Sequence, residues 1–426
     1  MTPLLRDTLY DAALHLLVPT ALAHLWWRGR RQPAYRQHIA ERFGRYATPP
    51  LTPRLWVHAV SVGETRAAQP LIRALQSTYP GQRILMTHTT PTGRETGEQL
   101  FGTSLDRLYA PYDLKRAVSR FIRHARPGLG LLMETELWPN LVRSVVHAGA
   151  PVFLLNARMS ERSARGYARF PGLTRDTLRA LSGIAAQSPA DAERLLALGA
   201  RNVTVTGNLK YDVTPDETAL ARGRRFREWF GAARQVILAA STREGEEPLV
   251  LDAFSRMNVP GALLVIVPRH PQRFDDVEAL VRARGLTCAR RSAERPVPPD
   301  VPVMLGDSMG ELFSYYAASD VAFIGGSLLP LGGQNLIEAC AVGTPVLVGP
   351  HTFNFTEATE LACGAGAAQR IAGPEELAAA LERLLRDAAA RTAMSSAART
   401  FADAHRGATG RVLRMIGPAL PLVRSR

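Results

Sequence analysis

Charged side chains that could move a proton follow predicted strands in the first half of the sequence. Glu64 lies in "SVGETR", directly after the apolar stretch 55–60, and Glu134 and Glu136 lie in "METELWPN". Lys210, in "TGNLKYD", is one of two lysines among 52 basic residues. Carboxylates and an ammonium group at one sheet edge suit acid–base catalysis on a hydroxyl group. Taken singly, each of these residues is better explained as a helix cap or an ion-pair partner.

The second half of the chain contains a glycine-rich stretch, "FIGGSLLPLGGQNLIEACAVGTPVLVGP", at residues 323–350. A predicted strand ends at Gly325-Gly326, and Gly332-Gly333 precedes a helix predicted to start near Gln334 and Asn335. Glycines let a phosphate approach the backbone, and a helix start offers free N–H donors. Glu338, one turn further on, is within reach of a ribose hydroxyl. By itself, a mobile glycine loop before a surface helix explains the stretch equally well.

Three further predicted strands of the second half also end in polar residues. "GDSMGEL" predicts a capping box from Asp307-Ser308 to Glu311, at the start of a helix. "VIVPRHP" and "AASTREGEE" end strands in basic residues that suit a phosphate. Four such strand ends predict a nucleotide site. Its candidate residues are Arg269, His270, Ser308, Met309, Gly310, Asn335 and Glu338, and Arg243 stands at a further strand end.

The elements that must position these residues alternate between strands and helices. Strands are predicted in two series, within residues 55–60, 83–89, 106–113, 129–136, 151–158, 183–188 and 202–212, and within 235–242, 262–270, 287–291, 302–307, 321–327 and 345–350. This alternation predicts an α/β fold with two doubly wound parallel sheets facing a central cleft. The predicted parts are an N-terminal helix (1–34), a first domain (35–215), a linker (216–231) and a second domain with C-terminal helices (232–426). Ligands bind at the carboxyl ends of such strands.

Composition narrows the class of partner. The 426 residues carry a net charge of +14, which indicates an anionic partner. The arginines are spread along predicted helices and aromatic residues make up only 7%, which argues against nucleic acid. Three distant cysteines without CxxC spacing exclude a zinc ribbon and a disulfide framework. No HExxH, Walker A or GxSxG motif occurs.

An apolar stretch near the N-terminus indicates contact with a membrane surface. Residues 12–27 form a run of about 16 mainly apolar residues, shorter than the roughly 20 that span a bilayer. Trp26 and Trp27 end it beside Arg28, Arg30 and Arg31, as in an interfacial anchor with a basic cytoplasmic flank. The alternative is a soluble helix that packs on the first domain.

Several motifs in order resemble one family, the 3-deoxy-D-manno-octulosonic acid (Kdo) transferases of lipopolysaccharide synthesis. The matching stretches are "WVHAVSVGE", "METELWPN", "NARMSERS", "GNLKYD", "PRHPQRF", "DSMGEL" and "GGQNLIEACAVGTPVLVGP". They extend over residues 35–360. The resemblance implies the two-domain GT-B glycosyltransferase fold and attachment to the cytoplasmic face of the inner membrane. The donor it implies is CMP-Kdo, and the acceptor is a phosphorylated, tetraacylated disaccharide precursor of lipid A.

The resemblance also implies roles for individual residues, in a direct inverting transfer without a metal or other cofactor. Glu64 matches the base that deprotonates the acceptor hydroxyl, and Glu134 and Lys210 match positions that stabilise the transition state. The matching CMP-binding positions are Pro268 and Arg269, Ser308 to Gly310, and Asn335, Leu336, Ile337 and Glu338. Ser61, Gly63, Glu136 and Arg243 are further candidates for contact with the acceptor or with Kdo, whose carboxylate would pair with Lys210 or Arg243. If the strand pleat continues past Glu134, then Glu136 shares its face.

Two other functions fit parts of the sequence. A GT-B enzyme that acts on a UDP-sugar, as a transferase or an epimerase, would share the glycine-rich loop, and preferential protection by CMP over UDP would argue against it. A non-catalytic scaffold at the membrane would tolerate the loss of Glu64. The motifs are common to enzymes that add one or several Kdo units, so they leave that number open.

Overall fold

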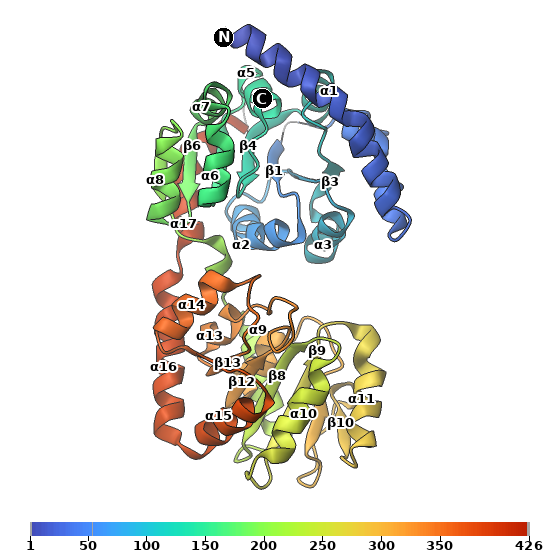
Figure 1. Ribbon diagram of the computed structural model, residues 1–426, viewed down its shortest axis with the longest axis vertical. Helices are drawn as coiled ribbons and strands as arrows, with labels where there is room; N and C mark the ends of the chain where they lie inside the picture. Colours follow the sequence, from blue (N-terminus) through green and yellow to red (C-terminus); the bar gives the residue numbers. More distant parts are fainter. Residues whose placement is uncertain (1, 53, 424–426) are drawn as a thin grey trace. The chain divides into compact units, whose positions relative to one another are not determined.

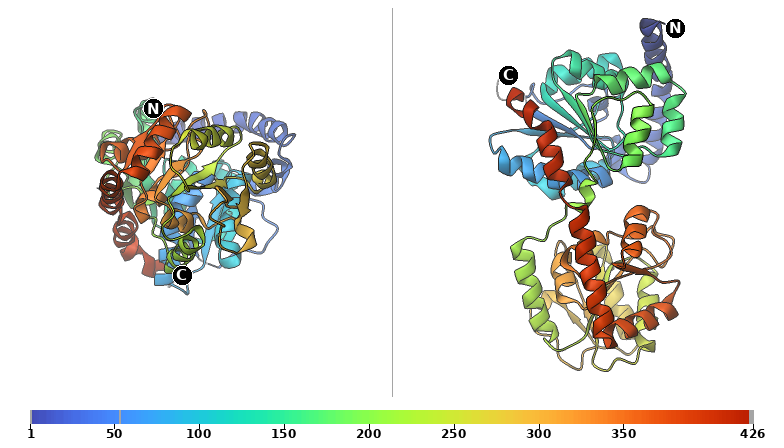
Figure 2. Two further views of the ribbon diagram at one scale, coloured as in Figure 1. Left: turned by 90° about the horizontal axis from the view of Figure 1, so that it is seen from below. Right: turned by 90° about the vertical axis from the view of Figure 1, so that its left-hand side faces the viewer.

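The computed structural model describes residues 2–52 and 54–423, which form two compact units. The first unit contains the chain up to Asp212 and again from Gly407 onwards, and the second contains Val213–Arg406. Each unit is an α/β domain with one parallel sheet of seven strands, and helices cover both faces of each sheet (Figures 1 and 2). The predicted fold class is therefore confirmed for each unit.

The first unit has the strand order β3-β2-β1-β4-β5-β6-β7, and all neighbouring strands pair in parallel. The order reverses between β1 and β4, so this sheet has its topological switch point there. The strands are β1 Arg54–His58, β2 Ile84–His88, β3 Asp106–Tyr109, β4 Pro127–Met133, β5 Val152–Ala157, β6 Gly183–Ala186 and β7 Val203–Val205.

The helices of the first unit are α1 Pro3–Arg28, α2 Val62–Thr78, α3 Pro91–Phe101, α4 Lys115–Ala125, α5 Pro139–His147, α6 Glu161–Ala168, α7 Pro171–Ala180, α8 Pro189–Ala197 and, after the chain returns, α17 Ala408–Ile416. Helices α2 to α8 connect the strands by crossovers. The alternation of side chains along β1 divides the core between the two faces of the sheet. Leu55 and Val57 pack in the cluster that contains residues of α2 and α17, whereas Trp56 packs in the cluster with α4 and α5.

The second unit has the strand order β10-β11-β9-β8-β12-β13-β14, again fully parallel. Its switch point lies between β8 and β12. The strands are β8 Val236–Thr242, β9 Leu263–Pro268, β10 Cys288–Arg290, β11 Val303–Leu305, β12 Val321–Ile324, β13 Val346–Val348 and β14 Ala368–Arg370. The last strand was not predicted, because three residues with one exposed arginine carry no strand pattern.

The helices of the second unit are α9 Glu217–Phe230, α10 Glu246–Arg256, α11 Phe274–Ala283, α12 Leu312–Ala318, α13 Ile337–Val342, α14 Thr356–Gly364, α15 Pro374–Arg386 and α16 Ala388–His405. One face of the sheet packs against α10, α11 and α15. Residues 216–231, predicted to be a linker, instead form α9 within this unit. The apolar face of α9 explains the difference, because Phe226 is buried with its ring 4.9 Å from that of Tyr315.

The C-terminal segment also differs from the predicted division, which placed it in the second domain. Asp212 accepts hydrogen bonds from the backbone N–H groups of Gly407 and Thr409 at the start of α17, with 2.6 Å to Gly407. A carboxylate is stabilised at that end of a helix. Val412 and Ile416 then enter the core of the first unit beside Leu209. A capping charge and two buried side chains thus hold the end of the chain in the first unit.

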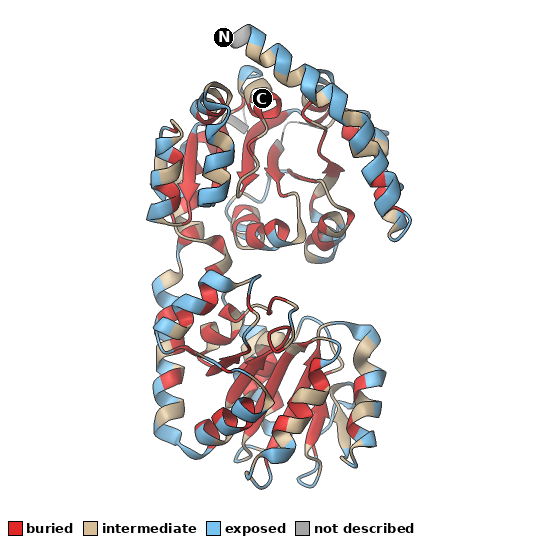
Figure 3. Cartoon of the chain, in the orientation of Figure 1, coloured by how far each residue is buried: buried red, intermediate tan, exposed pale blue. Residues whose placement is uncertain are grey.

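Helix α1 contacts the first unit mainly through polar groups. Arg6 pairs with Asp176 at 2.5 Å, Asp7 with Arg143 at 2.7 Å, and the Tyr10 hydroxyl donates to Asp113 at 2.8 Å. The rest of the helix is largely exposed (Figure 3), including Leu9, Leu16, Leu17, Trp26 and Trp27. In the described residues, no helix combines the length and the apolar character that crossing a bilayer requires.

Candidate active site

Glu64 lies in the first turn of α2, directly after β1, and is 7% exposed. The Oγ of Ser61, the N-cap residue, accepts a hydrogen bond from the Glu64 N–H at 3.3 Å. In return, Oε2 of Glu64 accepts the N–H of Val60 at 2.5 Å. This exchange resembles a capping box, so Glu64 does stabilise the start of the helix. Gly63 is exposed in the same turn.

The surroundings of Glu64 raise the pKa of its carboxyl group to about 8. Burial is the main cause, and the negative charges of Glu136 and Glu134 add to it, while the N–H of Val60 acts in the opposite direction. Raised carboxyl pKa values of this kind cluster at functional sites. A group with a pKa near the working pH accepts and returns a proton readily, as a general base must. Glu64 therefore combines capping with the properties of a base.

Glu134 lies one residue beyond the end of β4, at the same switch point. Its backbone is left-handed, with a φ of 56°. Glutamate seldom adopts this conformation, and such strain is concentrated at functional sites. The side chain turns to Lys210, whose Nζ lies 2.8 Å from Oε1 of Glu134. The structure thus brings together two residues predicted from distant motifs.

Glu136 has partners of its own. The strand ends at Met133, so the pleat that would place Glu136 on the face of Glu134 does not continue. Oε2 of Glu136 accepts the Nε1–H of Trp138 at 2.6 Å. Burial, and secondarily the charge of Glu134, raise the pKa of Glu136. His58 Nε2 lies 3.9 Å from this carboxylate, but burial lowers the pKa of His58 to about 3, so the contact is not an ion pair.

Three amide side chains hold the turn that carries Lys210. Asn156, at the end of β5, is fully buried with a left-handed φ of 53°. Its Oδ1 accepts the N–H of Leu209 at 2.8 Å, and its carbonyl accepts Nε2 of Gln187 at 2.9 Å. Gln187 in turn accepts Nδ2 of Asn208 at 3.1 Å, and Asn208 Oδ1 accepts the N–H of Lys210 at 3.0 Å. The ammonium group is therefore carried on a fixed turn.

In the second unit, the glycine pair after β12 permits a close approach of two backbones. A Cβ at Gly325 would lie 2.5 Å from the carbonyl oxygen of Ser241 and 2.6 Å from Cα of Thr242. Gly326 has a φ of 72°, and Gly332 and Gly333 are left-handed as well. The two glycine pairs are joined, because the Gly333 N–H donates to the Gly326 carbonyl at 2.6 Å. The loop is therefore folded back on itself at the switch point.

A buried carboxylate, Glu246, fixes this loop. Its side chain accepts three backbone N–H groups, from Arg243 at 3.0 Å, Gly326 at 2.5 Å and Leu328 at 3.0 Å. Glu246 is fully buried at the start of α10. Sequence reasoning treated "REGEE" as an acidic helix turn and did not select this residue.

Three basic side chains predicted to bind the donor gather at the ends of β8 and β9. The pKa of His270 is lowered by burial and by the positive charges of Arg243 and Arg269. Their mutual influence shows that the three groups share one edge, and the Arg269 N–H also donates to the carbonyl of Thr242 at 2.9 Å. Pro268 is buried behind them. An anionic ligand would relieve the repulsion between the two arginines.

The predicted capping box at residues 307–311 is wrong. Helix α12 begins at Leu312, and its N-cap, Glu311, makes no capping hydrogen bond. Asp307 instead accepts the N–H of Ser292 at 2.8 Å, and Glu311 pairs with Arg291 at 2.9 Å. Contacts with Arg291 and Ser292, on another segment, thus replace the local capping hydrogen bonds. The segment between them, Ser308 to Gly310, remains accessible, with Met309 54% exposed.

The predicted helix at Gln334 begins two to three residues later, because α13 starts at Ile337. Asn335 caps it, since its Oδ1 accepts the N–H of Ile337 at 3.0 Å and its Nδ2 donates to Glu338 at 3.2 Å. Leu336 and Ile337 are buried. Among these four candidates, the polar side chains of Asn335 and Glu338 are the ones that remain partly accessible.

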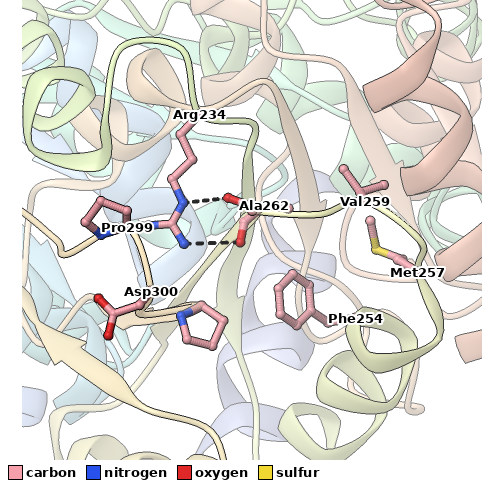
Figure 4. A pocket seen from close by; sticks show the side chains of 9 residues that line it. Arg234, Phe254, Met257, Val259, Ala262, Pro299 and Asp300 are labelled. Atoms are coloured by element: carbon pink, nitrogen blue, oxygen red, sulfur yellow. Dashed lines mark hydrogen bonds between the residues drawn. The ribbon is translucent and has the colours of Figure 1, made fainter.

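The second unit also has a cavity of about 380 Å³ at the opposite edge of its sheet (Figure 4). It lies at the amino ends of β8, β9 and β11, whereas the polar candidates lie at the carboxyl ends. Arg234 crosses it and donates to the carbonyl oxygens of Gly261 at 2.7 Å and Val301 at 2.7 Å. These bonds tie loops together, so we assign the cavity a structural role. Among the described residues, no cluster of His, Cys, Asp and Glu has a metal-binding arrangement.

Comparison with known proteins decides the family. A family model described as 3-deoxy-D-manno-octulosonic-acid transferase (kdotransferase) matches residues 37–213, and the model for group 1 glycosyl transferases matches residues 249–401. A Kdo transferase of Bordetella pertussis is 46% identical over 95% of this chain and 97% of its own length. One of Haemophilus influenzae is 37% identical over 96% and 98%. The chain belongs to the Kdo transferase family.

The enzyme class follows from this membership: the chain is a glycosyltransferase. A solved UDP-GlcNAc 2-epimerase from Neisseria meningitidis superposes with a TM-score of 0.56 at 16% identity, covering 85% of this chain and 99% of that one. At this identity the likeness concerns the fold. It agrees with two sheet domains of the GT-B kind. The first family model covers Glu64, Glu134 and Lys210, and the second covers the donor candidates at 268–338.

Proposed function

We propose that this Kdo transferase moves Kdo from CMP-Kdo to a phosphorylated, tetraacylated disaccharide precursor of lipid A, in lipopolysaccharide synthesis. The observation that carries the proposal is the environment of Glu64. A buried carboxyl with a pKa of about 8 stands at the switch point of the first unit, where an ion pair of Glu134 and Lys210 also lies. A mere capping residue needs neither feature.

In the proposed step, Glu64 takes the proton of an acceptor hydroxyl while that oxygen bonds to the anomeric carbon of Kdo. The bond from this carbon to the CMP phosphate oxygen breaks, and CMP leaves with the electron pair. Attack from the side opposite the leaving group inverts the anomeric centre. The base thus acts in the same step as bond formation, which suits a carboxylate already held in place by Val60.

The second unit is proposed to bind the donor and to stabilise the departing phosphate. Arg269 supplies positive charge, Arg269 and His270 supply N–H donors, and the loop fixed by Glu246 brings glycine backbone close to the ligand. Arg243 is the favoured partner for the Kdo carboxylate, because it directly follows β8 and none of the ion pairs in the described part of the chain involves its guanidinium group. Lys210, the other candidate, is already engaged with Glu134.

The acceptor is also proposed to place the enzyme at the cytoplasmic face of the inner membrane. Helix α1 exposes Leu9, Leu16 and Leu17 to solvent, while Arg6 and Asp7 contact the domain through ion pairs. Trp26 and Trp27 follow, with Arg30 over the Trp26 ring at 4.4 Å. Such a helix fits one that lies in the lipid headgroup region.

A mass-spectrometric transfer assay tests the reaction. CMP-Kdo is generated in situ, tetraacyl acceptor is added, and wild type is compared with Glu64→Gln and Glu64→Ala. The proposal expects the mass of one or more Kdo units on the acceptor with wild type and none with either variant, while CMP binding persists. A folded wild type that binds UDP in preference to CMP would instead support the UDP-sugar alternative, which family membership disfavours.

A further inference from the structure

A second cavity lies in the first unit, beside the segment that carries Glu134 and Glu136. Its volume is about 340 Å³, at the small end of the range for ligand sites. Four elements line it: α1, the segment 137–139, α6 and α7. The lining residues are Tyr10, Leu137, Pro139, Ser163, Gly166, Tyr167, Phe170, Leu173, Thr174 and Thr177. Apolar side chains and ring faces predominate, and no acidic or basic side chain is among them. We call this cavity the α6–α7 groove.

One wall of the groove contacts the chain segment that carries Glu134 and Glu136. The Tyr167 hydroxyl, in its wall, donates a hydrogen bond of 3.1 Å to the carbonyl of Thr135. Thr135 stands between Glu134 and Glu136, and the next residue, Leu137, lines the groove. The charge of Glu136 also raises the pKa of Tyr167, after burial. A ligand in the groove would therefore lie against the chain segment that holds the catalytic carboxylates.

The rim of the groove has the character of a site for an anionic amphiphile. Phe170, at the turn between α6 and α7, is 67% exposed, although an aromatic ring of this kind is normally buried. Arg169 directly precedes it, and Arg158, Arg162 and Arg165 are exposed in the chain segment before it. Within residues 2–52 and 54–423, none of these four guanidinium groups makes an ion pair. Apolar walls on a helix that also carries unpaired positive charges match an acyl chain attached to a phosphorylated head.

We propose that the α6–α7 groove holds one acyl chain of the acceptor lipid. The proposal rests on the function proposed above, and it deepens it by naming where the enzyme recognises acylation. The arginines would attract the phosphates of the disaccharide. The position of the chain beside residues 134–137 would bring the sugar hydroxyl towards Glu64. The enzyme would then prefer acylated over deacylated acceptors, by about fourfold for each methylene group that the groove takes from water.

Gly166 offers a way to fill the groove without disturbing the fold. It lies in α6, in helical backbone, and a Cβ added there meets no atom within 4 Å. Leucine also favours a helix more than glycine does. Gly166→Leu should therefore fold and occupy part of the groove. Gly364→Leu is a matched control, because Gly364 lies in α14 of the second unit and is equally uncrowded.

The first experiment does not depend on transfer. The full chain is mixed with a glucosamine phosphate that carries a 14-carbon acyl chain with a diazirine near its end, irradiated, and digested for mass spectrometry. The proposal expects labelling within residues 160–177, reduced about tenfold in Gly166→Leu and unchanged in Gly364→Leu. Labelling elsewhere, for example along α1 alone, or equal labelling of 160–177 in both variants, overturns it.

The second experiment uses transfer to measure specificity. The ratio of kcat/KM for the tetraacyl acceptor to that for the deacylated phosphorylated disaccharide should fall about tenfold in Gly166→Leu. It should fall severalfold in Phe170→Ser, which trims the exposed ring, and remain that of wild type in Gly364→Leu. An unchanged ratio in both groove variants overturns the proposal. Absence of transfer to either acceptor would contradict the proposed function, and cross-linking would still decide whether the groove takes an acyl chain.

Discussion

The ammonium nitrogen of Lys210 lies 2.8 Å from Oε1 of Glu134, a residue 76 positions earlier in the chain. Both side chains are partly accessible, at 35% and 20%. Exposed and half-exposed pairs contribute little to folding, so stability alone does not explain a left-handed backbone at Glu134 or the amide chain that holds Lys210. We therefore interpret the pair as a charged group that acts in the proposed reaction.

The first prediction separates catalysis from stability at this pair. Lys210→Met and Glu134→Gln should each lower kcat by about 10²–10³, because each removes preorganised charge from the transition state. Their free energies of unfolding should change by less than about 1 kcal/mol, as expected for a partly exposed pair. The double variant should be far less impaired than the product of the two losses. Losses of several kcal/mol in stability with near-normal kcat would show that the pair is structural.

The second prediction concerns the pH dependence of the base. Because the pKa of Glu64 is about 8, kcat/KM should rise roughly tenfold per pH unit below that value and level off above it. Glu64→Gln keeps an oxygen that can accept the Val60 N–H, so the helix cap survives while the base is lost. The expected loss in kcat/KM is about 10²–10⁴. A variant with wild-type activity would leave capping as the sole role of Glu64.

The same carboxyl predicts a pH-dependent stability, with a definite sign. A pKa raised from 4.5 to about 8 means that the folded state binds more protons than the unfolded chain between these values. The contribution of Glu64 to the stability of the wild type should therefore fall as pH rises from about 4.5 to about 8. Between these pH values, the free energy of unfolding of Glu64→Gln should rise relative to that of the wild type by on the order of a few kcal/mol. Urea unfolding at pH 5 and pH 9 measures the gain. A constant difference would contradict the raised pKa.

Much of this arrangement follows from sequence patterns. The strand runs place Glu64 and Glu134 after β1 and β4, and parallel strands bring their carboxyl ends to one edge. The pattern does not reveal what the side chains do there. The prediction that Glu136 shares the face of Glu134 assumed that the strand continues to residue 136. It was wrong because the left-handed backbone of Glu134 turns the chain out of the strand.

Other features depend on contacts between distant segments. In the sequence, nothing distinguishes Asn156 from the other residues of its predicted strand. Only its hydrogen bond to the N–H of Leu209 shows that it supports the turn of Lys210. Ser308 and Glu311 have capping-box spacing, but the Glu311 carboxylate pairs with Arg291 and the neighbouring Asp307 accepts from Ser292. The return of the chain at α17 rests on Asp212, nearly 200 positions earlier. Local periodicity carries no information on such partners.

The third prediction concerns Glu246, which holds the glycine loop by three backbone N–H groups. Glu246→Gln retains the shape but turns an NH₂ group towards at least one of these donors. The buried donor left unpaired should cost about 2–4 kcal/mol of stability. The affinity for CMP should fall about tenfold, because the loop loses its fixed form. Thermal unfolding and calorimetric titration with CMP measure the two effects.

Glu244 provides the matched control for that experiment. It lies two positions earlier in the same turn, and its side chain is 84% exposed. Glu244→Gln should leave the CMP affinity within about twofold of wild type and stability within about 0.5 kcal/mol. An equal loss in the two variants would trace the effect to the net charge of the turn, and not to the loop contacts of Glu246.

The fourth prediction tests α1 at a membrane. Leu16 is 80% exposed on the side of the helix away from the polar contacts to the domain. Burial of a leucine in lipid is worth about 1.5–3 kcal/mol, so Leu16→Glu should weaken binding to vesicles about tenfold or more. Leu361→Glu, at a 43% exposed site on α14, should bind as wild type does. Flotation with vesicles of phosphatidylethanolamine and phosphatidylglycerol measures the bound fraction.

Because Arg28, Arg30 and Arg31 follow the helix, binding should also weaken in vesicles without anionic lipid and at high salt. Wild-type protein that fails to float with anionic vesicles, or equal binding by Leu16→Glu, would contradict a surface role for α1.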